Sequence, residues 1–225
     1  MGLRRMNSRS SKFRELPHLY PILDADALMR AGVALIDAGQ ALYDTGLRWV
    51  QYRAKQGSDA EIVERMRELR RVFPAGESVL LLNDRVHLCA ESGADGAHVG
   101  QEDMAPAEAR RMLGPRKLLG VSTHNVAQVH TAAATGVADY LAIGPVFATG
   151  SKKNPDPVVG LEGVRAARAL THLPLVAIGG ISRETSRSVL EAGADAVAVI
   201  SALLPEGGCE MAQTVRDFLE HLRQS

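Results

Sequence analysis

The stretch LLNDRVHLCAESGADGAHVGQEDM, residues 81–104, contains two apolar runs, and each run ends abruptly in polar residues. The first ends at Asn83 and Asp84, and the second ends in Gly-Gln-Glu-Asp at residues 100–103. A strand that only fills a core gains nothing from ending in an amide and carboxylates, because buried polar groups need partners. The stretch therefore predicts two neighbouring strands whose ends face a polar ligand.

The rest of the chain repeats this alternation of short apolar runs with longer segments of helical periodicity. Strands are predicted at HLYPIL, RWVQY, SVLLL, GAHV, LLGV, DYLAI, PLVAI and AVAVI. Helices are predicted at residues 26–43, 58–72, 85–92, 126–135, 161–170, 183–192 and 209–223, with one more beginning at Pro106. Eight such units in 225 residues predict an α/β fold, a (β/α)8 TIM barrel rather than a doubly wound sheet. We expect residues 1–15 to form a flexible tail and residues 16–225 a single catalytic barrel.

Composition limits the classes of partner. Lys and Arg number 26, and so do Asp and Glu, so no global basic field exists to hold nucleic acid or a membrane surface. No apolar run approaches the roughly 20 residues that span a bilayer. The two cysteines, Cys89 and Cys209, have no metal-site or disulfide spacing, which favours a reducing compartment. We expect a cytoplasmic protein with small-molecule partners, a transit peptide at residues 1–15 being the alternative. The sequence does not predict its oligomeric state.

Three acidic residues, Asp95, Asp139 and Asp195, precede strands in a repeated Gly-containing segment. They resemble a carboxylate cluster. The amino ends of barrel strands, however, form the face that stabilises the fold rather than the face that carries chemistry. We therefore expect a structural role for all three.

The loops that follow the strands carry the chemistry of parallel barrels. Asp84 and Asp103 follow neighbouring strands without a converging His or Cys, an arrangement that suits Mg²⁺ held by a few protein oxygens, water and phosphate. The alternative is that each carboxylate caps the next helix. Arg53 and Lys55 alternate along a strand, so both should face the barrel mouth together with Gln51. Ion pairs between these cations and the two acids are the alternative to an anionic ligand.

Two further segments indicate phosphate binding. Residues 149–152, Thr-Gly-Ser-Lys, form a hydroxyl-rich loop with a cation, and Gly179–Gly180 lets a backbone approach an oxyanion closely. Solvated lysines are the alternative for Lys152 and Lys153. A glycine pair directly after a buried strand is harder to explain without a ligand.

Together these segments make the chain similar to the thiamine-phosphate synthase family from about Tyr20 to Leu204. The segments that carry the resemblance are VQYRAK, LLNDRVHLCAESGADGAHVGQEDM, LLGVSTHN, ADYLAIGPVFATGSKK, LVAIGGI and VAVISALL. The resemblance implies a transferase that joins an aminopyrimidine diphosphate to a (carboxy)thiazole phosphate and releases diphosphate. It implies Mg²⁺ as cofactor and no protein nucleophile, since the leaving group's charge is what needs stabilising.

The resemblance also implies a role for each site residue. Asp84 and Asp103 would bind the Mg²⁺, and Arg53, Lys55 and Lys152 would act on the diphosphate as catalytic cations. The substrate-binding residues it implies are Gln51, Arg53, Lys55, Asn83 and Ser122 for the pyrimidine diphosphate, with Lys152, and Thr149, Ser151, Gly180, Ile200 and Ser201 for the thiazole phosphate.

The chain departs from the family pattern at two positions. Ala54 stands where the family usually has an acid, on the opposite face from Arg53 by strand alternation, so its effect should fall on packing. Ser151 replaces a threonine and keeps a hydroxyl. Two other functions are alternatives: a thiazole tautomerase on the same barrel, with His124 as a substitute base, and a non-catalytic phosphate-binding regulator. The tautomerase usually places a histidine where this chain has Pro145.

Overall fold

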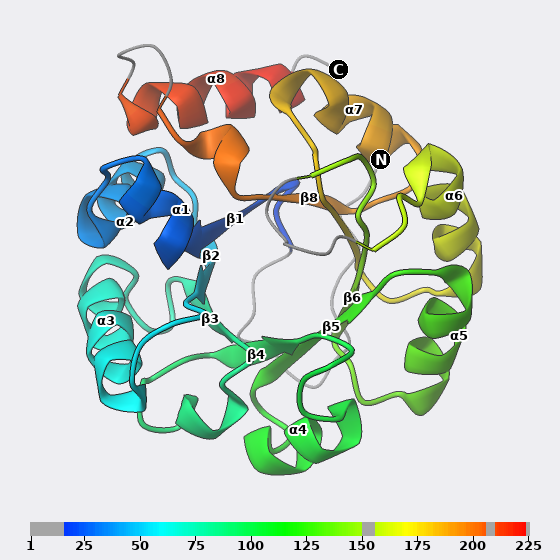
Figure 1. Ribbon diagram of the computed structural model, residues 1–225, viewed down its shortest axis with the longest axis horizontal. Helices are drawn as coiled ribbons and strands as arrows, with labels where there is room; N and C mark the ends of the chain where they lie inside the picture. Colours follow the sequence, from blue (N-terminus) through cyan, green and yellow to red (C-terminus); the bar gives the residue numbers. More distant parts are fainter. Residues whose placement is uncertain (1–15, 150–155, 206–209, 224–225) are drawn as a thin grey trace.

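Eight parallel strands close into a barrel in chain order, with β8 paired to β1. The computed structural model describes residues 16–149, 156–205 and 210–223. Figure 1 shows the barrel end-on, surrounded by helices. The strands are β1 (Leu19–Asp24), β2 (Trp49–Arg53), β3 (Val79–Asn83), β4 (Gly96–Val99), β5 (Leu118–Thr123), β6 (Tyr140–Ile143), β7 (Leu175–Ile178) and β8 (Ala196–Val199). The predicted (β/α)8 fold is confirmed.

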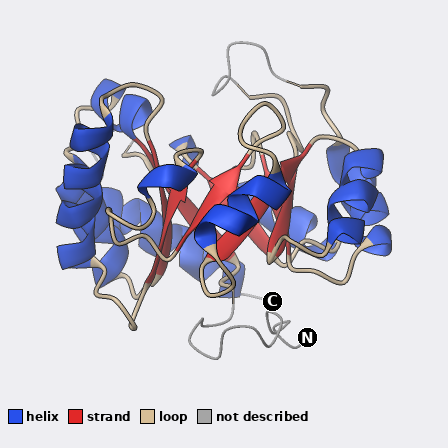
Figure 2. Ribbon diagram, turned by 90° about the horizontal axis from the view of Figure 1, so that it is seen from below, coloured by secondary structure: helices blue, strands red, loops and turns tan. Residues whose placement is uncertain are grey.

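The helices form the outer layer, and Figure 2 shows the strands enclosed between them. The ring closes where α8 packs against α2 and α7. The α-helices are α1 (Ala25–Arg30), α2 (Leu35–Asp44), α3 (Asp59–Val72), α4 (Pro106–Leu113), α5 (Val126–Thr135), α6 (Gly160–Leu170), α7 (Arg183–Glu191) and α8 (Met211–Arg223), and the short 3₁₀ helices are η1 (Val86–Leu88) and η2 (Ser201–Leu203). Within the described residues, none of these helices is both long and apolar enough to cross a bilayer.

Two predicted helices differ from the structure. The segment predicted as one helix at residues 26–43 forms α1 and α2, because Gly32 adopts a left-handed φ of 67° between them. The helix predicted at residues 85–92 is only the single turn η1. Residues 84–95 alone connect β3 to β4, whereas residues 124–139 connect β5 to β6, so the shorter connection has no room for a full helix.

Apolar side chains pack on both faces of the barrel sheet. Those pointing outward pack under the helices, and those pointing inward form a second cluster inside the barrel. The inner cluster contains Tyr20, Trp49 and Tyr140, whose rings meet edge to face with centroids 6.0 to 6.4 Å apart. This aromatic layer is the floor on which the functional site is built.

The acids that precede β4, β6 and β8 stabilise the amino ends of the strands, as predicted. Each carboxylate accepts a main-chain N–H from the strand before its own and pairs with an arginine from a helix. The three ion pairs are Arg70–Asp95, Arg110–Asp139 and Arg168–Asp195. Bound in this way at three separate places, these acids do not form a carboxylate cluster.

Candidate functional site

A cavity of about 840 Å³ opens at the carboxyl ends of the strands. Its floor includes Tyr20, and its walls come from all eight strands and from the segments that follow β1, β5, β6, β7 and β8. The predicted substrate-binding residues that line it are Gln51, Arg53, Asn83, Ser122, Thr149, Gly180, Ile200 and Ser201. The fold therefore brings these distant segments together around one space.

The two cations at and just beyond the end of β2 have different partners. Arg53 forms a largely buried ion pair with Asp24, at the end of β1, whereas Lys55 Nζ lies 3.0 Å from Asp84 Oδ2. The alternative in which both cations pair with Asp84 and Asp103 is therefore wrong for Arg53. Asp24 also caps α1, because its Oδ1 accepts the Ala27 N–H at 2.8 Å. The sequence analysis missed this residue, although it ends an apolar run just as Asp84 does.

Asp84 and Asp103 lie next to each other beyond the ends of β3 and β4. Burial raises the pKa of the Asp84 carboxyl, the neighbouring Asp103 carboxyl raises it further, and Lys55 opposes the shift. Asp103 Oδ2 accepts the Gly100 N–H at 2.8 Å. Neither acid caps a helix, since the caps are Arg85 for η1 and Ala105 for α4, and both lack a side-chain cap bond. The capping alternative is therefore wrong.

The backbone of Asp84 supports a functional reading of this acid pair. Its φ is 61°, and it is the only residue other than glycine with a positive φ in the described part of the chain. Such strained conformations cluster at functional sites. Two adjoining carboxylates, one of them destabilised by burial and by its neighbour, are the oxygen donors that a hard divalent cation needs. Within the described residues, no group of three or more His, Cys, Asp or Glu is arranged to hold a metal. One or two carboxylates, completed by water and substrate phosphates, are the usual ligands of Mg²⁺.

Gly179 and Gly180 have a structural reason to be glycine. Their φ values are 101° and 63°, and an added Cβ would lie 2.6 Å from Pro145 and 2.4 Å from Ala148 O. The segment after β6 pairs here with β7, through the Val146 N–H to Ile178 O and the Phe147 N–H to Gly179 O. The glycine pair thus has a structural explanation that does not require a ligand, and its role at a phosphate stays a prediction. The pair brings two backbones together at the cavity wall.

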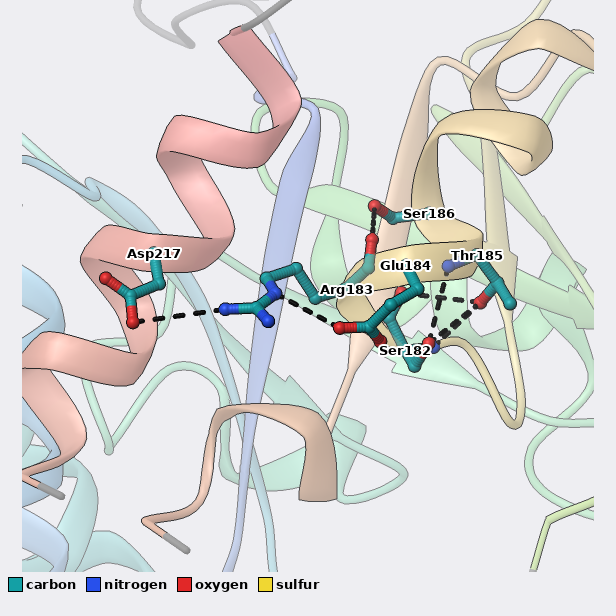
Figure 3. A network of polar contacts seen from close by, with 6 residues as sticks. All are labelled: Ser182, Arg183, Glu184, Thr185, Ser186 and Asp217. Atoms are coloured by element: carbon teal, nitrogen blue, oxygen red, sulfur yellow. Dashed lines mark hydrogen bonds and ion pairs between the residues drawn. The ribbon is translucent and has the colours of Figure 1, made fainter.

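The amino end of α7 follows directly and is held by several polar contacts (Figure 3). Ser182, which lines the cavity, caps the helix in a capping box with Thr185. Arg183 reaches both Glu184, at 3.2 Å, and Asp217 of α8, at 3.9 Å. These contacts fix the helix terminus at the cavity, and the positive end of a helix dipole favours an anion nearby.

A chain of hydrogen bonds crosses the floor of the cavity. Gln51 Nε2 donates to Tyr20 Oη at 2.8 Å, and Tyr20 Oη lies 2.9 Å from Tyr140 Oη. His98 Nδ1 lies 2.9 Å from Tyr140 Oη, and His98 Nε2 lies 2.8 Å from Ser122 Oγ. Burial lowers the pKa of His98 to about 4 and raises the pKa of Tyr20 to about 12, so both are neutral near pH 7.

The sequence analysis missed Tyr20, His98 and Tyr140. The one signal available was a histidine inside the otherwise apolar strand GAHV. His124, which it did consider, lies at the cavity wall with Nδ1 2.7 Å from Gly144 O and 3.5 Å from Asp156. It thus ties the end of β5 to both ends of the loop between β6 and α6. Ser151, Lys152 and Lys153 lie outside the described residues.

Comparison with known proteins points in one direction. A family model described as thiamine monophosphate synthase matches residues 19–203. The chain is 50% identical over 210 residues to the thiamine-phosphate synthase of Koribacter versatilis, covering 92% of this chain and 97% of that protein. It is 43% identical over 187 residues to the thiamine-phosphate synthase of Chloroflexus aurantiacus, covering 83% and 84%.

A solved structure agrees with these relatives. Thiamine phosphate pyrophosphorylase from Pyrococcus furiosus superposes with a TM-score of 0.80 at 28% identity, covering 97% of this chain and 98% of that one. The tryptophan synthase α-subunit of Pyrococcus furiosus, at 16% identity and a TM-score of 0.64, shares the fold alone.

Proposed function

The chain belongs to the thiamine monophosphate synthase family and has that family's transferase activity in thiamine biosynthesis, and from this premise we propose how its residues share the reaction. The substrates are the aminopyrimidine diphosphate and the (carboxy)thiazole phosphate. The cavity at the barrel mouth holds both, with the diphosphate toward β2, β3 and β4. The observation that carries this assignment is the grouping of Lys55, Asp84 and Asp103 beyond the ends of these three strands, with Arg53 lining the cavity at the end of β2.

The diphosphate is assigned to this side because it is where cations and a metal-ligand pair meet. Gln51 and Asn83 line the cavity, and Gln51 reaches the floor at Tyr20, so both are assigned to the pyrimidine that carries the diphosphate. Departure of diphosphate leaves the pyrimidine methylene electron-poor, and the thiazole nitrogen attacks it. Arg53 and Lys55 stabilise the negative charge that develops on the leaving group. Electrostatic stabilisation of this kind is usually the largest contribution to lowering such a barrier.

The thiazole phosphate is assigned to the opposite wall. Gly180, Ile200 and Ser201 border the cavity there, close to the capped amino end of α7. Main-chain N–H groups and a hydroxyl suit a phosphate monoester without requiring a cation. Thr149 lines the cavity at the start of the neighbouring loop and completes this wall. Ser151 and Lys152 are proposed to extend the anion contacts from the same loop.

Mg²⁺ is the proposed cofactor, and Asp84 and Asp103 are its proposed ligands. When bound, it would neutralise charge on the diphosphate and hold it toward the two cations. Lys55 also contacts Asp84, so this carboxylate would serve both the protein's own cation and the metal. The cytoplasm is the proposed compartment, in agreement with the free buried thiol of Cys89.

The test is diphosphate release with both substrates, measured against Mg²⁺ concentration. Asp84→Ala and Asp103→Ala should abolish turnover while preserving the circular dichroism spectrum, because neither acid packs in the core. Glu102→Ala is the matched control, since Glu102 is an exposed acid of the same loop, and it should keep full turnover. Turnover by either aspartate variant in metal-free buffer would disprove the metal assignment. Failure of the wild-type chain to release diphosphate would disprove the function itself.

A further inference from the structure

We propose that the hydrogen-bond chain under the cavity has one fixed direction, which makes Tyr140 and His98 positioning residues that turn the Ser122 hydroxyl proton toward the ligand. The proposal deepens the proposed function, because Ser122 lies among the residues assigned to the pyrimidine diphosphate. It concerns residues that only the structure brings together: Tyr140 and His98 come from β6 and β4, and Tyr20 from β1.

The direction follows from the donor at one end. Gln51 Nε2 carries only protons, so Tyr20 Oη is the acceptor in that bond. The buried Tyr20 hydroxyl still needs an acceptor for its own proton, and the acceptor that its contacts offer is Tyr140 Oη, 2.9 Å away, so we assign the Tyr20 proton to this bond. The Tyr140 proton in turn is directed to His98 Nδ1, also at 2.9 Å.

The tautomer of His98 is set by the same sequence of bonds. A neutral imidazole has one N–H donor and one acceptor nitrogen, so an Nδ1 that accepts from Tyr140 requires the proton on Nε2. Nε2–H then donates to Ser122 Oγ across 2.8 Å. Ser122 Oγ, having accepted this bond, keeps its own proton for a partner in the cavity that it lines.

The packing around the Tyr140–His98 hydrogen bond supports this arrangement of donors and acceptors. Gly120 of β5 lies beside the Tyr140–His98 bond, and a Cβ at this position would come within 2.3 Å of both Tyr140 Oη and His98 Nδ1. A side chain of any kind at residue 120 would therefore displace the bond. Tyr20 and Tyr140 are each about 1% exposed or less, so water does not compete for their protons.

The consequence for the reaction concerns the charge that Ser122 faces. A hydroxyl whose proton points into the cavity stabilises a negatively charged oxygen, whereas one that donates to His98 would present lone pairs and repel it. The series of hydrogen bonds thus orients the Ser122 hydroxyl as a donor to the departing diphosphate before substrate binds. It does so without any charged group in the barrel floor. Preorganised donors of this kind act without reorganisation during the reaction.

The direct test is the tautomer of His98 in the full-length protein without substrates. Uniform ¹⁵N labelling of histidine and two-bond proton–nitrogen correlations distinguish the two nitrogens, and loss of one signal set in His98→Gln assigns it among the seven histidines. We expect a neutral ring protonated on Nε2. A ring protonated on Nδ1 would show that the hydrogen bonds run in the opposite donor-to-acceptor direction, and it would overturn the proposal. Because this measurement needs no turnover, it stands apart from any failure of the proposed function.

The functional test is Tyr140→Phe, which removes the link and keeps the ring. We expect His98 to become a mixture of tautomers and kcat to fall by about 10-fold with little change in KM, less than the roughly 10² to 10³ lost with a whole preorganised donor. Tyr52→Phe is the control, since Tyr52 is also buried but packs outside the barrel, and it should change neither kcat nor the tautomer. An unchanged tautomer together with an unchanged kcat in Tyr140→Phe would also overturn the proposal.

Discussion

Replacing Asp24 tests whether the cation of β2 is held ready for the diphosphate. The Asp24 side chain is 6% exposed and its Arg53 partner 16% exposed, so their ion pair is largely buried. Asp24→Asn removes the charge and keeps an oxygen that can still cap α1. Asp24→Ala removes both the charge and the cap. The pair of variants therefore separates the two roles of one carboxylate.

The expected losses follow from these contacts. Removing one partner of a buried ion pair costs about 3 to 5 kcal/mol, and we expect about 2 to 3 kcal/mol here because the cavity gives water some access to Arg53. Losing the cap adds about 1 kcal/mol in Asp24→Ala. With a urea slope of about 3 kcal/mol per M for a chain of this size, the midpoint should fall by about 1 M in Asp24→Asn and slightly more in Asp24→Ala.

The assay is urea unfolding followed by circular dichroism and by the fluorescence of Trp49, the only tryptophan in the chain. Coincident transitions from the two signals would justify two-state free energies. Arg53→Met and the double variant complete a thermodynamic cycle. We expect a coupling energy of at least about 1 kcal/mol.

A second measurement connects this ion pair to function. In Asp24→Asn the Arg53 charge has no partner until an anion arrives, so diphosphate with Mg²⁺ should raise the unfolding midpoint of this variant more than that of the wild type. Additive single losses in the cycle, within about 0.5 kcal/mol, would refute the ion-pair reasoning. Equal stabilisation of both proteins by diphosphate would refute the placement of Arg53 at the anion.

Three further outcomes are expected. Lys55→Ala should weaken binding of the pyrimidine diphosphate more than that of the thiazole phosphate, and equal losses in calorimetry would contradict the division of the cavity. Because burial lowers the pKa of His98 to about 4, the unfolded chain takes up a proton near pH 6.5 that the folded chain does not, so stability present above pH 6.5 is lost on acidification. Relative to His98→Gln, the wild type should lose on the order of 3 kcal/mol between pH 6.5 and 4, measured by urea unfolding, and parallel curves would contradict this. Lys152→Ala should lower kcat by about 10² to 10³ while Lys153→Ala is mild and Ser151→Thr is tolerated, and the reverse order for the two lysines would place the loop motif one residue away.

The sequence by itself determined the architecture and the face of the barrel that carries chemistry. Short apolar runs that alternate with helical segments leave few arrangements other than a parallel barrel, because each strand must be buried on both sides. Polar residues at the ends of the runs then point to one rim, so Gln51, Asn83 and Ser122 could be placed at a common cavity. The acids before β4, β6 and β8 could likewise be assigned to the opposite, stabilising face.

Only the tertiary structure decided which of these residues are partners. From the sequence, Asp84 and Asp103 were the candidate ion-pair partners of Arg53. In the barrel β1 lies beside β2, and Arg53 pairs with Asp24 instead. The need for Gly179 and Gly180 comes from the backbone after β6, which no local pattern reveals. The series of hydrogen bonds that begins at Gln51 and ends at Ser122 joins side chains from five strands, which meet inside the barrel. A hydrogen bond forms only when the donor–acceptor distance falls within a window of a few tenths of an ångström and the direction is right. Strand register and barrel closure set these distances, and the order of residues along the chain does not.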